Sequence, residues 1–558
     1  MRRLTRTLAA ALPALALGSS LLTAVPAQAV TDHVEVGLYG TSDPTFDGVY
    51  RQSLAILGLA AAGRTPRPEA VRWLLDQQCA DGSFSSYRSG STCAPFDPVA
   101  FSGGPDSNAT AMAVQALDAV GTTAAKAAAI KAATWLRGVQ LGDGSWEYTP
   151  GGSGAGDPNS TGLVLLALNA EGLVPTTSVV PYYQSLQVGW TGTPAPADLG
   201  GISTPWNPGT PDALATVQSV VGPRGTDLTA VGRLTGTWAD SARVVSTPPA
   251  ATGAGVAGWA ASWIARDVTA AGPAAYASGN ATDAAWAVLS LAADRSAETT
   301  ARSLEAELAG LPASTSPATN GQGALAAATV DDWTGLATFA DRIEASLTKD
   351  TTAPSATWTG VPARSWAGWY VTVTRSAASD AFWPAASLTQ TVLWGDGSAT
   401  VVNGSVSRVS HRYFQPGAHR ITVWTTDPSG NRAPTTAGTV TVLADTVAPA
   451  ASVLVPSSPQ RRASWARVAV AAGDRGSGVL TVRVRIAQQR NGSWVSWNGR
   501  RWIAGTSGWV TATRVTGTTR WTVASPTLAL GRLVVTARAW DRSGLASLPS
   551  SAVTTLTR

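Results

Sequence analysis

The sequence predicts a multidomain chain in which an all-helical ring comes first and two all-β sandwiches follow. Three observations lead to this prediction. Helical hairpins repeat along the first half, alternating Thr-, Val- and Trp-rich segments begin after Lys349, and short proline-containing linkers separate the later segments. We therefore expect a helical part over residues 30–347 and β-sandwiches over residues 354–443 and 447–558.

The N-terminus has the pattern of a secretory signal peptide over residues 1–29. Three arginines among the first six residues precede an apolar run from Leu8 to Val25, and alanines occupy positions 27 and 29 at the expected cleavage site. A membrane anchor is the alternative, but proline and glycine interrupt the run, which is shorter than the roughly 20 apolar residues that a span needs. We predict a secreted, extracellular protein without a transmembrane segment after cleavage, whose association with the cell wall would be non-covalent.

The two cysteines, Cys79 and Cys93, lie 14 residues apart. Because an exported chain meets an oxidising environment, we predict a disulfide between them. Two free thiols are the alternative. A zinc pair is disfavoured, since structural zinc takes four Cys or His ligands and the nearest histidine is His33. The sequence therefore predicts neither a metal site nor a cofactor.

Charge is distributed unevenly along the chain. Residues 447–558 contain 15 arginines and two acids, a net charge of +13, in a chain whose total is +5. Removal of the three leader arginines leaves +2, so residues 30–446 carry −11. A basic surface on the last module is expected.

Helical repeats organise the first half. Three segments, at residues 108–117, 159–168 and 280–289, open with Asn-x-Thr and continue as apolar runs. Polar residues before such runs and glycines after them are helix start and stop signals. Weaker copies at 47–63, 211–222 and 331–343 bring the number to six, with a second helix between consecutive copies.

Helices that are apolar over most of their length must be buried on several sides. Six of them, flanked by six amphipathic ones, would close as an α6/α6 toroid, whereas an open solenoid is the alternative. The rim at the inner-helix N-termini is the expected site for a small molecule, a glycan or a surface protein. Its candidate residues are Asp47, Tyr50, Asp106, Asn108, Asp157, Asn159, Asn280 and Asp283.

Two segments after outer helices support this arrangement. Trp135-Leu-Arg-Gly-Val-Gln-Leu-Gly-Asp-Gly-Ser-Trp146 and its counterpart at 73–84 resemble the Gln-x-x-x-Gly-x-x-Trp-type repeat of the prenyltransferase and squalene cyclase superfamily. That superfamily also includes transcobalamin-like vitamin B12 binders. The resemblance implies an α/α toroid, with Asp-Gly-Ser in a tight turn and the aromatic residue packed beneath it.

Catalytic residues of that superfamily are largely missing. Protein prenyltransferases hold zinc with Asp, Cys and His, and His33 is the one histidine before Lys349. Squalene-type cyclases use Asp-x-Asp-Asp, and the nearest match, Thr329-Val-Asp331-Asp332, lacks the first acid. Asp331 is therefore a weak catalytic candidate, and a helix cap is the favoured interpretation of this pair. The rim acids also recur where caps are needed, so no pair stands out for glycan cleavage.

The first β module has a motif of its own. Trp394-Gly-Asp-Gly-Ser398, followed by His411-Arg-Tyr413, resembles the polycystic kidney disease (PKD) domain. The resemblance implies a spacer or a module with weak protein and glycan contacts. Trp394 is expected in the core.

The last module ends in Leu533-Val-Val-Thr-Ala-Arg-Ala-Trp540-Asp541, which is similar to bacterial immunoglobulin-like surface domains. Tryptophans lie among arginines in its middle, and this combination suits anionic glycans and polyphosphates. The candidate residues are Arg490, Trp497, Arg500, Arg501 and Trp502. An anionic cell-wall polymer is the expected partner, and nucleic acid is disfavoured because an exported protein meets wall polymers first.

The predicted function is that of a secreted, non-catalytic binding protein with a ligand-binding toroid, a spacer and a wall-adhesion module. Two alternatives stay open. One is a terpenoid cyclase-like or glycan-cleaving toroid enzyme, and the other is a purely structural adhesin.

Overall fold

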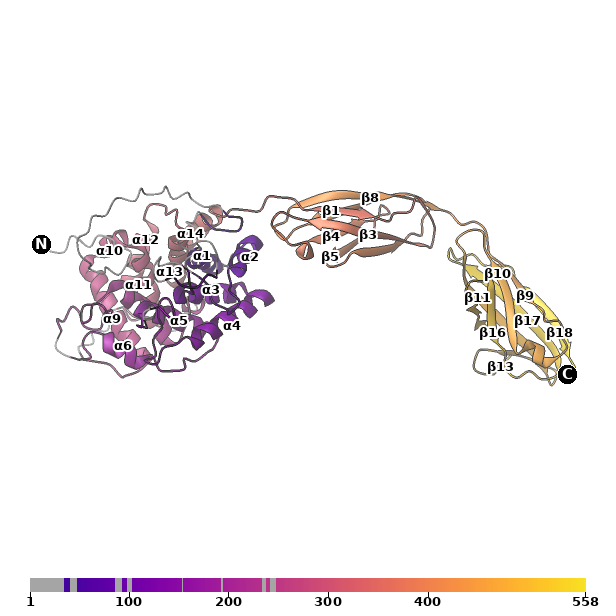
Figure 1. Cartoon of the computed structure of the whole chain (residues 1–558), viewed down its shortest axis with the longest axis horizontal. Coiled ribbons are helices and arrows are strands. Elements are labelled where there is room, and N and C mark those ends of the chain that lie inside the picture. The colour runs from indigo at the N-terminus through magenta and orange to yellow at the C-terminus, as the bar shows by residue number, and fades with distance from the viewer. Residues whose placement is uncertain are drawn as a thin grey trace. The chain divides into compact units, whose positions relative to one another are not determined.

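The computed structural model describes residues 35–40, 48–85, 93–97, 103–152, 154–191, 194–232, 237–240 and 247–557. It divides between Thr348 and Lys349 into a helical unit and a β unit (Figure 1). The predicted order, a helical part followed by β-sandwiches, is confirmed. The predicted signal peptide, His33 and the rim candidate Asp47 lie outside the described residues.

Inner and outer helices alternate along the described part of the helical unit. The six inner helices are α1 (Val49–Ala61), α3 (Ser107–Val120), α5 (Pro158–Ala170), α7 (Ala213–Gln218), α11 (Ala281–Asp294) and α13 (Pro317–Thr329). Each packs on the next, and α13 packs on α1, which closes the ring. The six outer helices are α2 (Pro68–Asp76), α4 (Thr123–Gly138), α6 (Val180–Leu186), α9 (Gly253–Ala271), α12 (Glu298–Ala309) and α14 (Trp333–Ala345).

The sixth repeat differs from the expectation. The sequence placed its inner helix at residues 331–343, but α14, which covers this segment, is an outer helix with one buried stripe. The inner helix is α13, which is buried almost all round and is capped by Ser316. Because α13 lacks the Asn-x-Thr signal, the repeat pattern does not mark it as an inner helix, and the prediction falls on the amphipathic α14.

Glutamines that follow the outer helices tie neighbouring repeats together. Nε2 of Gln78 donates to the Gly82 carbonyl at 3.1 Å and to the Ala128 carbonyl of α4 at 2.8 Å. The same pair of bonds is made by Gln140, to Gly144 and Thr177, and by Gln187, to Gly200 and Val256. Each amide therefore holds its own turn closed and also joins it to the next repeat.

The aromatic residue of the repeat motif lies beneath this turn. Phe84 and Trp146 are fully buried. Their amides donate at 3.0 Å to the hydroxyls of Thr110 and Thr161, the threonines of the Asn-x-Thr segments. The two motifs of the repeat are thus in direct contact.

Part of the chain fills one end of the ring. Short helices α8 (Leu228–Val231) and α10 (Pro273–Gly279) and the 3-10 turn η1 (Gly222–Arg224) connect the main helices. Helix α8 packs against α1, α3 and α11, and the Leu228 amide donates to Oε1 of Gln115 at 3.0 Å. Because α3 and α11 lie on opposite sides of the ring, α8 covers its interior at this end.

The β unit begins with a sandwich of eight strands, called the first sandwich. One sheet has the order β1-β3-β6 and the other β2-β8-β7-β4-β5. The strands are β1 (Ser355–Thr359), β2 (Arg364–Trp366), β3 (Tyr370–Ser379), β4 (Thr389–Leu393), β5 (Ala399–Asn403), β6 (Arg408–Arg412), β7 (Gly417–Thr426) and β8 (Arg432–Leu443). All pairs are antiparallel except β2 with β8.

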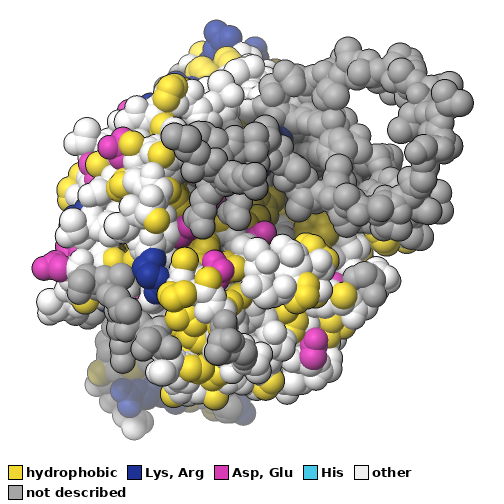
Figure 2. All heavy atoms as spheres, turned by 90° about the vertical axis from the view of Figure 1, so that its left-hand side faces the viewer, with side chains coloured by type: hydrophobic (Ala, Val, Ile, Leu, Met, Phe, Trp, Pro, Cys, Tyr) yellow, Lys and Arg dark blue, Asp and Glu magenta, His cyan; other side chains and the backbone are white. Residues whose placement is uncertain are grey.

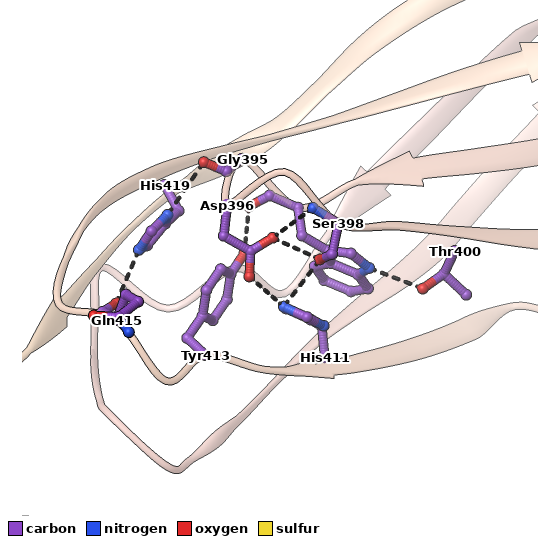
Figure 3. A network of polar contacts seen from close by, with 9 residues as sticks. Gly395, Asp396, Ser398, Thr400, His411, Tyr413, Gln415 and His419 are labelled. Carbon is purple, nitrogen blue, oxygen red and sulfur yellow. Dashed lines mark hydrogen bonds and ion pairs between the residues drawn. The ribbon is translucent and has the colours of Figure 1, made fainter.

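A polar network stabilises the turn after β4 in the first sandwich (Figure 3). Trp394 is fully buried, as expected, and its carbonyl accepts from the Tyr413 hydroxyl at 2.7 Å. Nε2 of His411 lies 2.7 Å from Oδ2 of Asp396, and the His411 ring stacks on Trp394. Burial would raise the pKa of Asp396, but hydrogen bonds from Ser398 and His411 outweigh it and lower this pKa to about 2.

The second sandwich follows with ten strands. Its sheets have the orders β15-β16-β10-β9 and β13-β12-β11-β17-β18, with β14 paired to β11. The strands are β9 (Ala450–Leu454), β10 (Arg467–Gly473), β11 (Val479–Arg490), β12 (Ser493–Trp497), β13 (Trp502–Ala504), β14 (Val510–Thr511), β15 (Thr513–Arg514), β16 (Arg520–Ala524), β17 (Gly531–Asp541) and β18 (Ser550–Leu556). Trp465, Val484 and Ile486 belong to its core.

The predicted disulfide between Cys79 and Cys93 is present, and it joins two residues that lie 14 positions apart. Replacing both cysteines by serine should lower the free energy of unfolding of the helical unit by about 3 kcal/mol, because the unfolded chain regains loop entropy. Chemical denaturation of the full chain measures this loss. Reaction of the unreduced protein with a thiol reagent would contradict the bridge.

The Asp396 network predicts a loss of stability in acid. A lowered folded-state pKa means that the stabilisation is present above the unfolded value near 3.9 and disappears as the pH falls through about 2. Asp396→Asn should cost about 1 kcal/mol at pH 6 and reduce the acid dependence of β-unit unfolding. If the wild-type protein and Asp396→Asn lost stability by the same amount between pH 4 and 2, this assignment would be contradicted.

Candidate functional site

The described rim candidates lie at inner-helix N-termini, and three of the seven serve as caps. Asp106 accepts from the Ala109 amide at 2.7 Å, and Asp157 accepts from the Asn159 amide at 3.0 Å. Asn280 caps α11 through the amides of Thr282 and Asp283. Their recurrence is thus explained by helix ends that need acceptors.

The other rim candidates have different surroundings. Tyr50 lies in the first turn of α1 and packs against the core. Nδ2 of Asn159 donates to Oε1 of Gln218 at 3.2 Å, which joins the N-terminus of α5 to α7. Asn108 has a buried Oδ1 without a hydrogen-bond partner.

Two rim carboxyls have raised pKa values. Burial raises the pKa of Asp283 to about 6, and the nearby charge of Asp212 acts in the same direction. Burial also raises the pKa of Asp157, against hydrogen bonds from Asn159 and Ser160. The N-termini of α5, α7 and α11 therefore bring together three acids, of which the sequence prediction had missed Asp212.

The weak catalytic candidate Asp331 is not buried in a cavity. It is exposed, has a left-handed backbone with φ 60°, and lies between α13 and α14. Asp332 caps α14 through the Thr334 amide, whereas Asp331 caps no helix. Of the two acids, only Asp332 has the expected cap role. Asp331 is exposed to water and so does not have the shielded position that a cyclase-type proton donor needs.

A groove of about 300 Å³ lies on the outer side of the ring between α12 and α14, and no sequence pattern predicts it. Its lining includes Asp332, Gly335 and Phe339. Glu305 of α12 lies close to Gly335 and Asp332. Burial and then the Asp332 charge raise the pKa of Glu305 to about 7.

One face of the helical unit is seen in Figure 2. Hydrophobic and uncharged surface predominates there, acidic side chains are scattered among it, and basic side chains are few. This face accordingly differs in character from the arginine-rich second sandwich.

The predicted polyanion-binding residues of the second sandwich lie partly in its interior. Trp497 and Trp502 form a cross-strand pair and pack against the core, with ring centroids 5.9 Å apart. The guanidinium of Arg490 lies 4.1 Å from the centre of the Trp502 ring. Arg500 and Arg501 are exposed in the turn between β12 and β13.

A second group of arginines and tryptophans lies on the outward face of the β11–β17 sheet. Arg483 of β11 is paired with Arg538 of β17, and both guanidiniums lie over the Trp540 ring, at 5.6 and 5.3 Å. Arg485 lies over Trp509 at 5.2 Å, and Arg532 over Trp494 at 5.9 Å. These seven residues are called the Arg–Trp face.

Strand register explains why this face was not selected from the sequence. Val482, Val484 and Ile486 point into the core, so Arg483 and Arg485 point outward. Apolar and charged residues alternate from Thr481 to Ile486, which is typical of a half-exposed strand, but only the pairing of β11 with β17 brings Arg538 and Trp540 alongside it.

Comparisons with known proteins concern the β unit. No family model matches the chain, and no curated protein matches it. The fibronectin(III)-like modules of Clostridium thermocellum CbhA are 13% identical over 37% of this chain and 94% of theirs, with a TM-score of 0.18. The FN1–FN3 domains of chicken CNTN1 are 16% identical over 38% and 67%, with a TM-score of 0.19.

A 1.5-MDa bacterial ice-binding adhesin is 18% identical over 38% of this chain and 65% of that chain, with a TM-score of 0.18. These scores are too low to support an argument about function. The sandwich fold is established by the strand pairing itself.

The raised pKa of Asp283 predicts the pH dependence of the helical unit. Because the folded-state value of about 6 exceeds the unfolded value near 3.9, stability should rise as the pH falls through 6 and reach its full gain below the unfolded pKa. Asp283→Asn should raise stability at pH 7 by about 2 kcal/mol and flatten this dependence.

Urea unfolding of the helical unit between pH 4 and 7 measures the effect, and Asp331→Asn, at an exposed site, is the control. An unchanged pH profile in Asp283→Asn would contradict the assignment.

Proposed function

We propose that this chain is an exported, non-catalytic binding protein that attaches to an anionic surface polymer through the Arg–Trp face. In this proposal the first sandwich, which resembles a PKD domain, is a spacer. The helical toroid offers its rim and outer groove to a small molecule, a glycan or a surface protein. None of the helices among the described residues has the length and apolar composition of a membrane span.

The observation that supports attachment most strongly is the pairing of guanidinium with indole on one sheet face. Each guanidinium that stacks on an indole keeps N–H groups at its edge, and these can donate to sulfate, phosphate or carboxylate oxygens. The module has 15 arginines and two acids, so little negative charge competes for them. Planar aromatic rings beside the cations also suit sugar rings.

The nucleic-acid alternative uses the same stacking chemistry. Export, which the N-terminal sequence predicts, favours wall polymers instead. A competition experiment distinguishes the two ligands. The protein should bind to a cell-wall preparation, and single-stranded DNA should displace it less effectively than soluble wall polymer does at the same concentration of negative charge.

A second candidate function is glycan cleavage at the rim, favoured by the raised pKa values of Asp157 and Asp283 near Asp212. Incubation of the protein with oligosaccharides, followed by an assay for new reducing ends, tests it. Activity that disappears in Asp283→Asn would replace the non-catalytic proposal.

Attachment through the Arg–Trp face predicts a site-specific loss on mutation. Arg483→Gln with Arg538→Gln should weaken retention on cell walls and on heparin by about tenfold, because two stacked guanidiniums are removed from one face. Arg514→Gln with Arg520→Gln removes the same charge from exposed positions in the other sheet and should have a smaller effect.

Binding of the wild-type protein to cell walls and to heparin should weaken steeply as the salt concentration is raised, since exposed charges are screened beyond about 8 Å at physiological ionic strength. Equal losses in the two variant pairs would mean that net charge alone attracts the polymer. Retention that is unchanged in molar salt would show that the Arg–Trp face is not used.

A further inference from the structure

The acids of the β unit are concentrated in two places. Residues 349–558 contain seven acidic residues, and six of them form two clusters of three. In each cluster, one carboxylate oxygen from each residue lies within 4.8 Å of those from the other two. The first cluster is Asp350, Asp380 and Asp427, and the second is Asp445, Asp474 and Asp541.

Backbone amides hold the first cluster in place. Oδ1 of Asp350 accepts from the Thr352 amide at 3.0 Å, and Oδ1 of Asp380 accepts from the amides of residues 382 and 383. Asp427 accepts from the amide and the side chain of Asn431. Oδ2 of Asp350 and Oδ2 of Asp380 are buried without a hydrogen-bond partner, and only 4% of Asp350 is exposed.

The second cluster has the same construction. Oδ1 of Asp445 accepts from the Val447 amide at 3.1 Å, and Oδ2 of Asp474 accepts from the amides of residues 476 and 478. Oδ1 of Asp541 accepts from the Leu545 amide at 2.8 Å. Oδ2 of Asp541 and Oδ1 of Asp474 are buried without a partner, and only 1% of Asp541 is exposed.

The two clusters occupy equivalent places in two different sandwiches. Asp350 and Asp445 each begin an Asp-Thr-x-Ala-Pro segment before the first strand of their sandwich. Asp380 and Asp474 directly follow β3 and β10, the partners of those first strands. Asp427 and Asp541 stand at the ends of β7 and β17, and each accepts from the amide four residues later. The same triad is therefore built twice.

No basic side chain among the described residues forms an ion pair with the carboxylates of these triads, although the second sandwich carries 15 arginines. Three carboxylates at this separation repel one another strongly, and buried unpaired oxygens are costly. An external cation would remove both penalties.

We propose that each triad binds a divalent cation of the calcium type. All the side-chain donors are oxygens, which hard cations prefer, and neither histidine nor cysteine is present to favour zinc. Two ligands of one calcium ion lie at most about 5 Å apart, twice the bond length, and the triads satisfy this limit. Water and backbone carbonyls would complete the coordination.

The bound cation would order the linker segments. In each sandwich, the cation would join the segment before the first strand to the loops that follow two other strands of the same sandwich. At the second triad, the Ser477 amide donates to Asp445, and its carbonyl accepts from Nε1 of Trp369 in the first sandwich. The Arg542 carbonyl, next to Asp541, accepts from Nη2 of Arg412 at 3.1 Å. The second cation would therefore steady loops through which the two sandwiches are in contact.

Calcium titration of the full chain after chelator treatment tests the two sites. Calorimetry with CaCl2 should give two ions per chain, and terbium should luminesce when tryptophan is excited, because Trp383 and Trp540 adjoin the triads. Asp380→Asn and Asp474→Asn should each leave one ion, and the double variant should leave none. Asp331→Asn, an exposed change in the helical unit, should retain two.

Thermal unfolding of the β unit separates cation binding from simple structural damage. In EDTA, the double variant should unfold at the same or a higher temperature than wild type, since repulsion has been removed. Calcium should raise the unfolding temperature of wild type and leave the double variant unchanged.

Failure of wild type to take up calcium, or uptake that persists in the double variant, would overturn the proposal. If the wild-type protein bound only one calcium ion, the proposal would be overturned for the triad whose Asp→Asn variant still binds that ion. Binding to polymer through the Arg–Trp face is a separate property, and neither result would decide the other.

Discussion

The helical ring depends on a glutamine side chain that serves two repeats at once. Gln78, Gln140 and Gln187 each donate from one amide nitrogen to a carbonyl of their own turn and to a carbonyl of the following repeat. Gln187 is buried and the other two are partly buried, so the loss of these hydrogen bonds would be costly, and the turn and the neighbouring repeat must form together. This constraint couples the first four repeats of the ring, so these repeats are not a row of independent hairpins.

The same clamp explains the glycine of the repeat motif. At Gly144, φ is 94°, and a Cβ atom would lie 2.2 Å from the Ser178 carbonyl oxygen. A larger residue would therefore push the next repeat away and break the bonds from Gln140. The close approach also brings Trp146 beneath the turn, where its amide meets Thr161 of the inner helix. Hydrogen bonds from Gln140 and from the Trp146 amide therefore connect the outer turn to both the next repeat and the inner helix.

In the β unit, the arginines and the acids of the two triads occupy different places. Cations lie along the outward face of the β11–β17 sheet, where indole rings rather than carboxylates contact them. The acids stand instead at strand ends and linkers, in two triads held by backbone amides. Because none of the described arginines forms an ion pair with these acids, both groups are left for external partners. That separation underlies the proposal of polymer attachment and the proposal of cation binding.

The sequence by itself determined the order of the modules, the disulfide and five of the six inner helices, because each depends on local signals: apolar periodicity, caps, and spacing of cysteines. It did not determine the sixth inner helix, since α13 lacks the Asn-x-Thr start and is recognised by its burial alone. It also missed both acidic triads, although the repeated Asp-Thr-x-Ala-Pro segments were visible.

Only the tertiary structure decided which groups meet. Asp350 and Asp427 are 77 positions apart, and Arg483 and Trp540 are 57 apart. Their contacts depend on strand order and register, which a local pattern does not encode. For the same reason, the sequence did not reveal that Trp497 and Trp502, which are predicted to bind an anionic polymer, also pack partly against the core.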